Sequence, residues 1–236
     1  MLEIDVALTA MADAAAVARG PVILVEPLYG GVAVTAALDA GWGSVLVDAG
    51  SPDDSPLPLV SFEQAPPSGH AGGRCRVPAS DLLDAALGIE PDGANLVLVG
   101  GPTNARPLAS MLAACTETWD CITLVPAAAA GTVSADALWA AGVVIRILLE
   151  ELEDRASRLT DFAGVAVTLA TGAEDPRGHL GAGERWRRHL ERGGHPDDLR
   201  VASAIDSFGV VPRVAAWHRD DRAVLVEPWT PTAAGR

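Results

Sequence analysis

The chain contains no lysine, and this absence shapes its charge. Among 236 residues, Asp and Glu total 31 against 17 basic residues, all of them arginine, and the formal net charge is -14. General binding to nucleic acid or to an anionic membrane surface needs a basic face, so the composition argues against both. A small anionic substrate is not excluded, because a few converging arginines, backbone amides or a metal ion can bind one.

Aromatic residues, cysteines and long apolar runs are also scarce. Aromatics make up only 4% of the chain, so Ala, Val and Leu must fill the core. Cys75, Cys115 and Cys121 match no CxxC metal or redox motif, and no export signal is recognisable, so we expect free thiols in a cytoplasmic protein. Arg74 and Arg76 flank Cys75, an arrangement that can lower the pKa of a thiol. No stretch reaches the roughly 18 consecutive apolar residues of a membrane span.

Short apolar runs alternate with amphipathic segments along the chain. The apolar runs predict strands at 21–26, 44–47, 95–99, 121–125 and 223–226. The amphipathic segments predict helices at 32–40, 81–87, 108–115, 134–152 and 183–192. This alternation predicts an α/β fold, with a largely parallel or mixed sheet, in a single domain over residues 1–236. The first two strands, joined by a helix, are expected to be parallel.

Two segments lack this alternation. Residues 51–80 are rich in Pro, Gly and Ser and are expected to form a long irregular loop, with Ser80 as the N-cap of the helix that follows. The tail from residue 230 is expected to be disordered.

Polar side chains follow three of the predicted strands. In open α/β sheets ligands bind beyond the carboxyl ends of the strands. Glu26 closes the first strand, Thr103 and Asn104 follow the third, and Ser134 and Asp136 come after the fourth. Glycines, hydroxyl groups and helix N-termini near these positions favour anion binding. We therefore take these five residues as candidate catalytic residues.

Carboxylates near these strand ends also suggest a metal. Oxygen ligands suit a hard cation such as Mg²⁺, which pairs naturally with phosphate. Glu26, Asp81 and Asp136 are the candidate ligands.

Each candidate has a structural alternative. Glu26 could be a helix cap or a surface charge, and Thr103-Asn104 could be a plain turn. Ser134 and Asp136 could serve only as N-cap and first-turn acid of their helix. The basic segment 185–192 is typical of a salt-bridged helix face, with anion binding as the alternative. The sequence has no GxGxxG, Walker, GxSxG or HExxH motif to decide among these roles.

An ordered set of segments resembles the 2-phosphosulfolactate phosphatase (ComB-like) family. Residues 26–31 (EPLYGG) are similar to the family's DVLRAT loop, with Tyr29 in place of its arginine. Residues 102–106 (PTNAR) are similar to its TTNGT loop, and residues 130–142 (AGTVSADALWAAG) to its AGT…SLEDALCAG stretch. The family's Gly-rich loop is reduced to Gly72-Gly73-Arg74.

Two further segments extend this resemblance. Asp81 matches a family aspartate. Near the end, residues 198–212 follow the family's DI-x-FC-xx-LD-x₄-VP pattern, with Ala202 at the cysteine position. The chain thus resembles a divergent member of the family.

The resemblance implies a three-layer α/β/α architecture and a magnesium-dependent phosphatase. The substrate would be a small anionic phosphate monoester, 2-phosphosulfolactate or a related phospho-acid. Arg74, Arg106, Gly131 and Thr132 would bind it. The alternative is a catalytically degenerate relative that binds a small anion or a protein partner. A homodimer is also expected.

Overall fold

A computed structural model describes most of the chain. It covers residues 1–7, 20–50, 58–62, 72–89, 96–115, 118–127, 134–153, 155, 157–173 and 175–230. The tail beyond residue 230, about half of the 51–80 segment, and the predicted substrate-binding residues Gly131 and Thr132 lie outside the described residues.

The described strands form one mixed sheet of nine, in the order β4-β3-β9-β8-β5-β2-β6-β1-β7. The strands are β1 (Leu2–Val6), β2 (Val22–Val25), β3 (Ser44–Asp48), β4 (Arg74–Pro78), β5 (Val97–Gly100), β6 (Cys121–Pro126), β7 (Ser157–Leu159), β8 (Pro212–His218) and β9 (Ala223–Pro228). Strands β5, β2, β6, β1 and β7 run parallel to one another, whereas β8 and β9 pair in antiparallel fashion. The predicted α/β class is confirmed.

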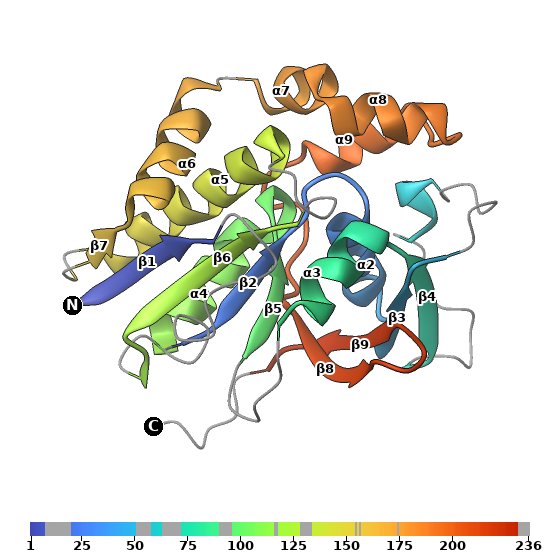
Figure 1. Ribbon diagram of the computed structural model, residues 1–236, viewed down its shortest axis with the longest axis horizontal. Coiled ribbons are helices and arrows are strands. Elements are labelled where there is room, and N and C mark those ends of the chain that lie inside the picture. The colour runs from blue at the N-terminus through green and yellow to red at the C-terminus, as the bar shows by residue number, and fades with distance from the viewer. Residues whose placement is uncertain are drawn as a thin grey trace.

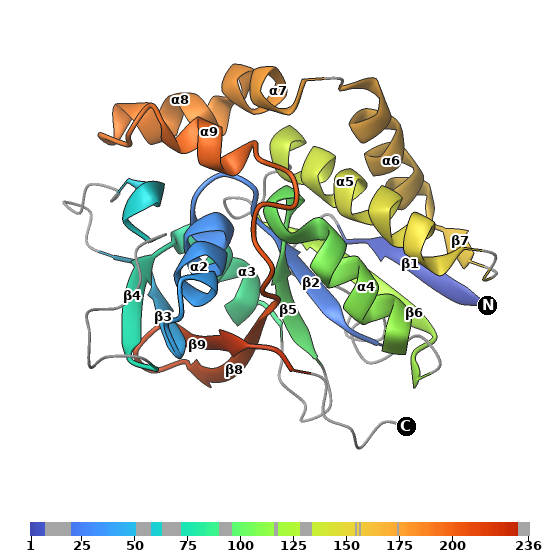
Figure 2. The same cartoon turned by 180° about the vertical axis from the view of Figure 1, so that it is seen from behind.

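The helices are α2 (Gly30–Asp39), α3 (Ser80–Leu87), α4 (Ala105–Cys115), α5 (Ala135–Leu152), α6 (Asp161–Gly172), α7 (Pro176–Ala182), α8 (Glu184–Glu191) and α9 (Asp198–Ala202), with short 3-10 helices η1 (Leu59–Ser61) and η2 (Pro102–Asn104). Helix α3 lies in front of the sheet in Figure 1, and α2, α4 and α5 lie in front of it in Figure 2, seen from behind. This is the three-layer α/β/α arrangement that the resemblance implied. None of the helices in the described ranges is long and apolar enough to cross a membrane.

The central strands are buried on both faces. Every residue of β2, β5 and β6 is buried, as expected for strands covered by helices on each side. Their Val, Ile and Leu side chains fit a pleated, buried surface, and Ala-rich helices pack closely against them. On α5, Gly142 permits close contact with α6, because a Cβ there would lie 2.0 Å from the Ala166 carbonyl oxygen.

Two sequence expectations about the sheet are wrong. Strands β2 and β3 are not a parallel pair, since β5, β8 and β9 lie between them and three antiparallel pairings separate them. The segment expected to be a long irregular loop contains strand β4, which pairs in parallel with β3. Apolar patterning did not reveal β4 because it is an edge strand with Arg74 and Arg76 on its exposed side.

Of the two N-caps predicted from the sequence, one is confirmed and one is wrong. Ser134 is the N-cap of α5, and its Oγ accepts a hydrogen bond from the Ala137 N–H at 3.3 Å, as predicted. Ser80, also predicted as an N-cap, is instead the first residue of α3, which Ala79 precedes without a capping side chain.

The thiol of Cys75 does not have the lowered pKa that its flanking arginines suggested. Burial raises the pKa of its thiol to about 11. Side chains alternate between the two faces of a strand, so Arg74 and Arg76 point away from the face that Cys75 occupies.

Asn104 holds the loop after β5 in place. The residue is fully buried; its Oδ1 accepts a hydrogen bond from the Gly101 N–H, and its Nδ2 donates to the carbonyls of Val99 and Val210. The Thr103 carbonyl accepts a further bond from the Phe208 N–H. These bonds join η2 to the segment that leads into β8.

We expect Asn104→Ala to destabilise the protein by about 2–4 kcal/mol, because it leaves a buried N–H and a buried carbonyl without partners. Urea unfolding measures this loss. Ser110→Ala, on the exposed side of the adjoining helix, is the control and should change stability by less than about 0.5 kcal/mol. An Asn104→Ala protein of unchanged stability that has lost activity would instead assign Asn104 to the chemistry.

Candidate functional site

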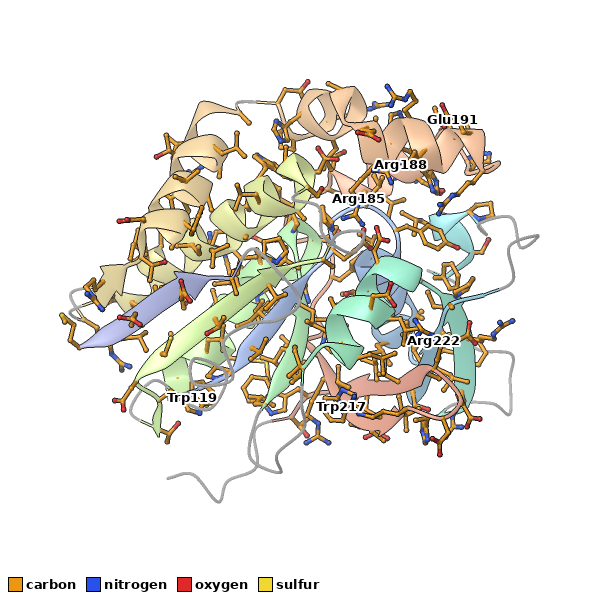
Figure 3. The ribbon with its side chains drawn as sticks, viewed as in Figure 1. Trp119, Arg185, Arg188, Glu191, Trp217 and Arg222 are labelled. Carbon is orange, nitrogen blue, oxygen red and sulfur yellow. The ribbon has the colours of Figure 1, made fainter. Side chains whose placement is uncertain are left out.

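A largely buried guanidinium lies at the carboxyl ends of the central strands. Arg185, on α8, has a side chain only 12% exposed. Its Nη2 lies 2.5 Å from Glu26 Oε1 and 3.1 Å from Asp81 Oδ2, and its Nη1 donates to the Ala127 carbonyl that follows β6. Figure 3 shows Arg185 between α8 and the strand ends. One side chain therefore joins α8, α3 and the loops after β2 and β6.

Glu26 is held as firmly as the arginine. Its carboxylate accepts hydrogen bonds from the backbone N–H groups of Leu28, Tyr29 and Gly31, the last at 2.8 Å. These donors lie at and just before the start of α2, where unpaired N–H groups favour a negative charge. Glu26 therefore caps the start of α2, as the alternative to a catalytic role proposed, and it also pairs with Arg185.

Glycine makes this close approach possible. A Cβ on Gly31 would lie 2.4 Å from the Glu26 carbonyl oxygen, and one on Gly30 would lie 2.5 Å from the Cβ of Ala79. The Gly-Gly pair after Tyr29 therefore lets α2 begin directly against Glu26 and the start of α3.

Asp81 and Asp136 approach the same guanidinium. Burial raises the pKa of the Asp81 carboxyl, Arg185 opposes this rise, and Glu26 adds to it. Burial likewise raises the pKa of Asp136, with Arg185 and His179 opposing and Glu26 adding. Since Asp81 pairs with Arg185 at 3.1 Å and Asp136 lies against Gly183, two residues before Arg185, the three predicted acidic residues gather at one place.

Helix α8 divides its arginines between two faces. Arg188 and Arg192, the residue that follows α8, lie three and seven residues after Arg185 and also lower the pKa of Asp81, and Arg188 pairs with Glu184 at 3.3 Å as well. On the outer face Arg187 lies near Glu184 and Glu191, at 3.9 and 3.7 Å. The interpretation as a salt-bridged helix face is therefore confirmed for Arg187, and anion binding by the segment stays a prediction.

The arginines predicted to bind substrate lie elsewhere. Arg106 pairs with Glu150 and Glu151, which follow Asp136 by 14 and 15 residues and so lie about 21 Å further along α5. Arg74 begins β4, about 13 Å of strand away from Pro78 at the end that leads to Asp81. Neither is among the residues that contact the carboxylate cluster. Arg185 was missed because nothing local in the sequence links it to Glu26, 159 residues earlier.

The predicted metal ligands are arranged around an arginine. Glu26 and Asp81 both pair with Arg185, whereas Asp136 forms no ion pair among the described residues. Across the described ranges, no group of three His, Cys, Asp or Glu side chains is placed to hold a metal ion by itself. A cation bound here would need water or substrate oxygens as further ligands, which Mg²⁺ commonly uses.

The comparison with family models decides the family. Residues 86–216, more than half of the chain, match the model described as 2-phosphosulpholactate phosphatase. The chain belongs to this family. The match contains Asn104, Asp136 and Arg185, while Glu26 and Asp81 precede it. No curated protein matches the chain.

Gly183 packs directly against Asp136, so a substitution there measures how closely this phosphatase-family site is packed. A Cβ on Gly183 would lie 2.4 Å from Asp136 Oδ2, so we expect Gly183→Ala to destabilise the protein by about 1–3 kcal/mol and to displace Asp136. Thermal unfolding measures the effect.

Gly164→Ala on α6 is the matched control. A Cβ there meets nothing within 4 Å, so the change should be neutral or stabilising by up to about 1 kcal/mol. Equal behaviour of the two variants would contradict the close packing of Gly183 on Asp136.

Proposed function

We propose that this protein hydrolyses a small phosphate monoester at Arg185, with Mg²⁺ as cofactor. The substrate that family membership favours is 2-phosphosulfolactate or a related phospho-acid. The observation that carries the proposal is the buried guanidinium at the strand ends, held by Glu26 and Asp81 in a member of a phosphatase family. Phosphoryl transfer depends mainly on positioning and on charge stabilisation, and a fixed guanidinium provides both.

Charge balance supports a divalent cation. Glu26, Asp81 and Asp136 oppose the charges of three arginines, so the cluster has little net positive charge for a dianionic phosphate; the arginines are Arg185, Arg188 and Arg192. Asp136 is the ligand we propose for Mg²⁺, since Glu26 and Asp81 already pair with Arg185. When bound, Mg²⁺ would polarise the phosphoryl oxygens and neutralise part of their charge.

The remaining predicted site residues have more limited roles in this proposal. Ser134 caps α5 and so orients Asp136 two residues later. Thr103 and Asn104 shape the loop after β5, and a direct catalytic part for either stays a prediction. Arg74 and Arg106 lie outside the cluster, and Gly131 and Thr132 stay predicted substrate contacts. The homodimer, the cytoplasmic location and the absence of a nucleic-acid partner also stay predictions.

The direct test is phosphate release from 2-phosphosulfolactate and a panel of small phosphate esters, with Mg²⁺ and again with EDTA. We expect turnover that EDTA abolishes. Arg185→Lys keeps the charge but loses the fork that reaches two carboxylates, so kcat/KM should fall about 100-fold or more. Arg106 is an exposed residue of α4 that pairs with Glu150 near the end of α5, so Arg106→Ala should leave kcat/KM unchanged.

Two results would contradict the proposal. Folded protein that releases no phosphate from any ester, yet binds inorganic phosphate, would support the catalytically degenerate alternative. Equal losses in Arg185→Lys and Arg106→Ala would place the chemistry elsewhere.

A further inference from the structure

Two polar side-chain atoms beside the Arg185 cluster are buried without a hydrogen-bond partner. Trp139 lies on α5 three residues after Asp136, on the same helix face, and is 1% exposed. Within the described part of the chain, neither Trp139 Nε1 nor His179 Nε2 has a partner. Buried N–H groups in proteins nearly always have an acceptor, so an oxygen from outside the described residues is expected here.

The two side chains lie together. Their ring centroids are 5.1 Å apart and the ring planes are inclined by 34°. Gly183 joins α7, which carries His179, to α8, which carries Arg185, and a Cβ on Gly183 would lie 2.4 Å from Asp136 Oδ2. Trp139, His179 and Arg185 thus approach one small region from α5, α7 and α8.

This region is not sealed inside the core. His179 borders a cavity of 560 Å³ at the end of α6 and the start of α7, which Leu169, Ala173 and Asp175 also line. A small molecule in this cavity would lie against His179, the member of the ring pair that lines it.

We propose that Trp139 Nε1–H and His179 Nε2–H donate hydrogen bonds to an oxyanion of the substrate, forming a second subsite beside Arg185. The inference rests on the proposed phosphatase function. His179 donates from Nε2 in the tautomer that carries its proton there, and Trp139 can only donate. The oxyanion is either the phosphoryl group or the acid group of a phospho-acid, both of which present oxygen acceptors.

Trp139→Phe is the most direct variant, because it keeps an aromatic ring and removes the N–H. His179→Phe removes both ring nitrogens, and His179→Gln restores a donor near the Nε2 position. Trp217→Phe is the matched control, since Trp217 Nε1 donates to the Ala86 carbonyl at 3.0 Å. This control should lower the unfolding temperature and leave kinetics unchanged. Trp139→Phe should leave the unfolding temperature unchanged or raised, because its N–H has no partner to lose among the residues that the structure describes.

The substrates are 2-phospholactate and isopropyl phosphate, which carries a methyl group in place of the carboxylate. We expect Trp139→Phe and His179→Phe each to lower kcat/KM for 2-phospholactate about 10- to 100-fold, with recovery in His179→Gln. A loss confined to 2-phospholactate supports the subsite and identifies the acid group as its ligand. An equal loss on isopropyl phosphate supports it with the phosphoryl group as ligand. Unchanged kinetics on both esters in Trp139→Phe and His179→Phe would overturn the inference.

A wild-type protein that hydrolyses no ester of the panel, these two and 2-phosphosulfolactate included, would defeat the proposed function and still allow the subsite to be tested. Calorimetry with inorganic phosphate and with lactate then measures binding directly. Binding weakened about tenfold or more by Trp139→Phe supports the subsite, and binding that is absent or unaffected by the change overturns it.

Discussion

The buried guanidinium of Arg185 is the interaction on which the arrangement of the strand ends depends. A charge with 12% exposure is costly unless it is paired, and here Glu26, Asp81 and the Ala127 carbonyl pair it. These partners come from the loops after β2 and β6 and from α3. Helix α8 must therefore lie across the end of the sheet, as Figure 1 shows. Small residues permit this geometry, because Gly31 and Gly183 leave space that the backbone and carboxylates occupy.

The proposed function requires this cluster to bind an anionic substrate in an acidic protein. Long-range attraction cannot guide the substrate, since the chain carries a net charge of -14. Under the proposed function, attraction would instead be local, from Arg185, Arg188 and Arg192 and from Mg²⁺. Asp81 and Asp136 carry raised pKa values because burial disfavours their charge, and added positive charge nearby would relieve that cost. Substrate, cation and carboxylates would then balance one another within a few ångströms.

Local sequence patterns predicted the fold better than the site. Buried strands such as β2 and β6 are uninterrupted apolar runs, and Ser134 has the residue type of an N-cap, so both were predictable. Strand β4 was not, because an exposed edge strand carrying arginines lacks an apolar run. Glu26, Asp81 and Asp136 were chosen for their places after strands or at helix starts, and they do gather. Arg185 was not chosen, because its pairing with Glu26 spans 159 residues and depends on how α8 crosses the sheet.

The most direct test of the account is a crystal structure with Mg²⁺ and a non-hydrolysable phosphonate analogue of the substrate. The account predicts phosphonate oxygens within hydrogen-bond distance of the Arg185 guanidinium, with the cation next to Asp136. A phosphonate bound at Arg74 or Arg106, with Arg185 contacting only Glu26 and Asp81, would contradict it.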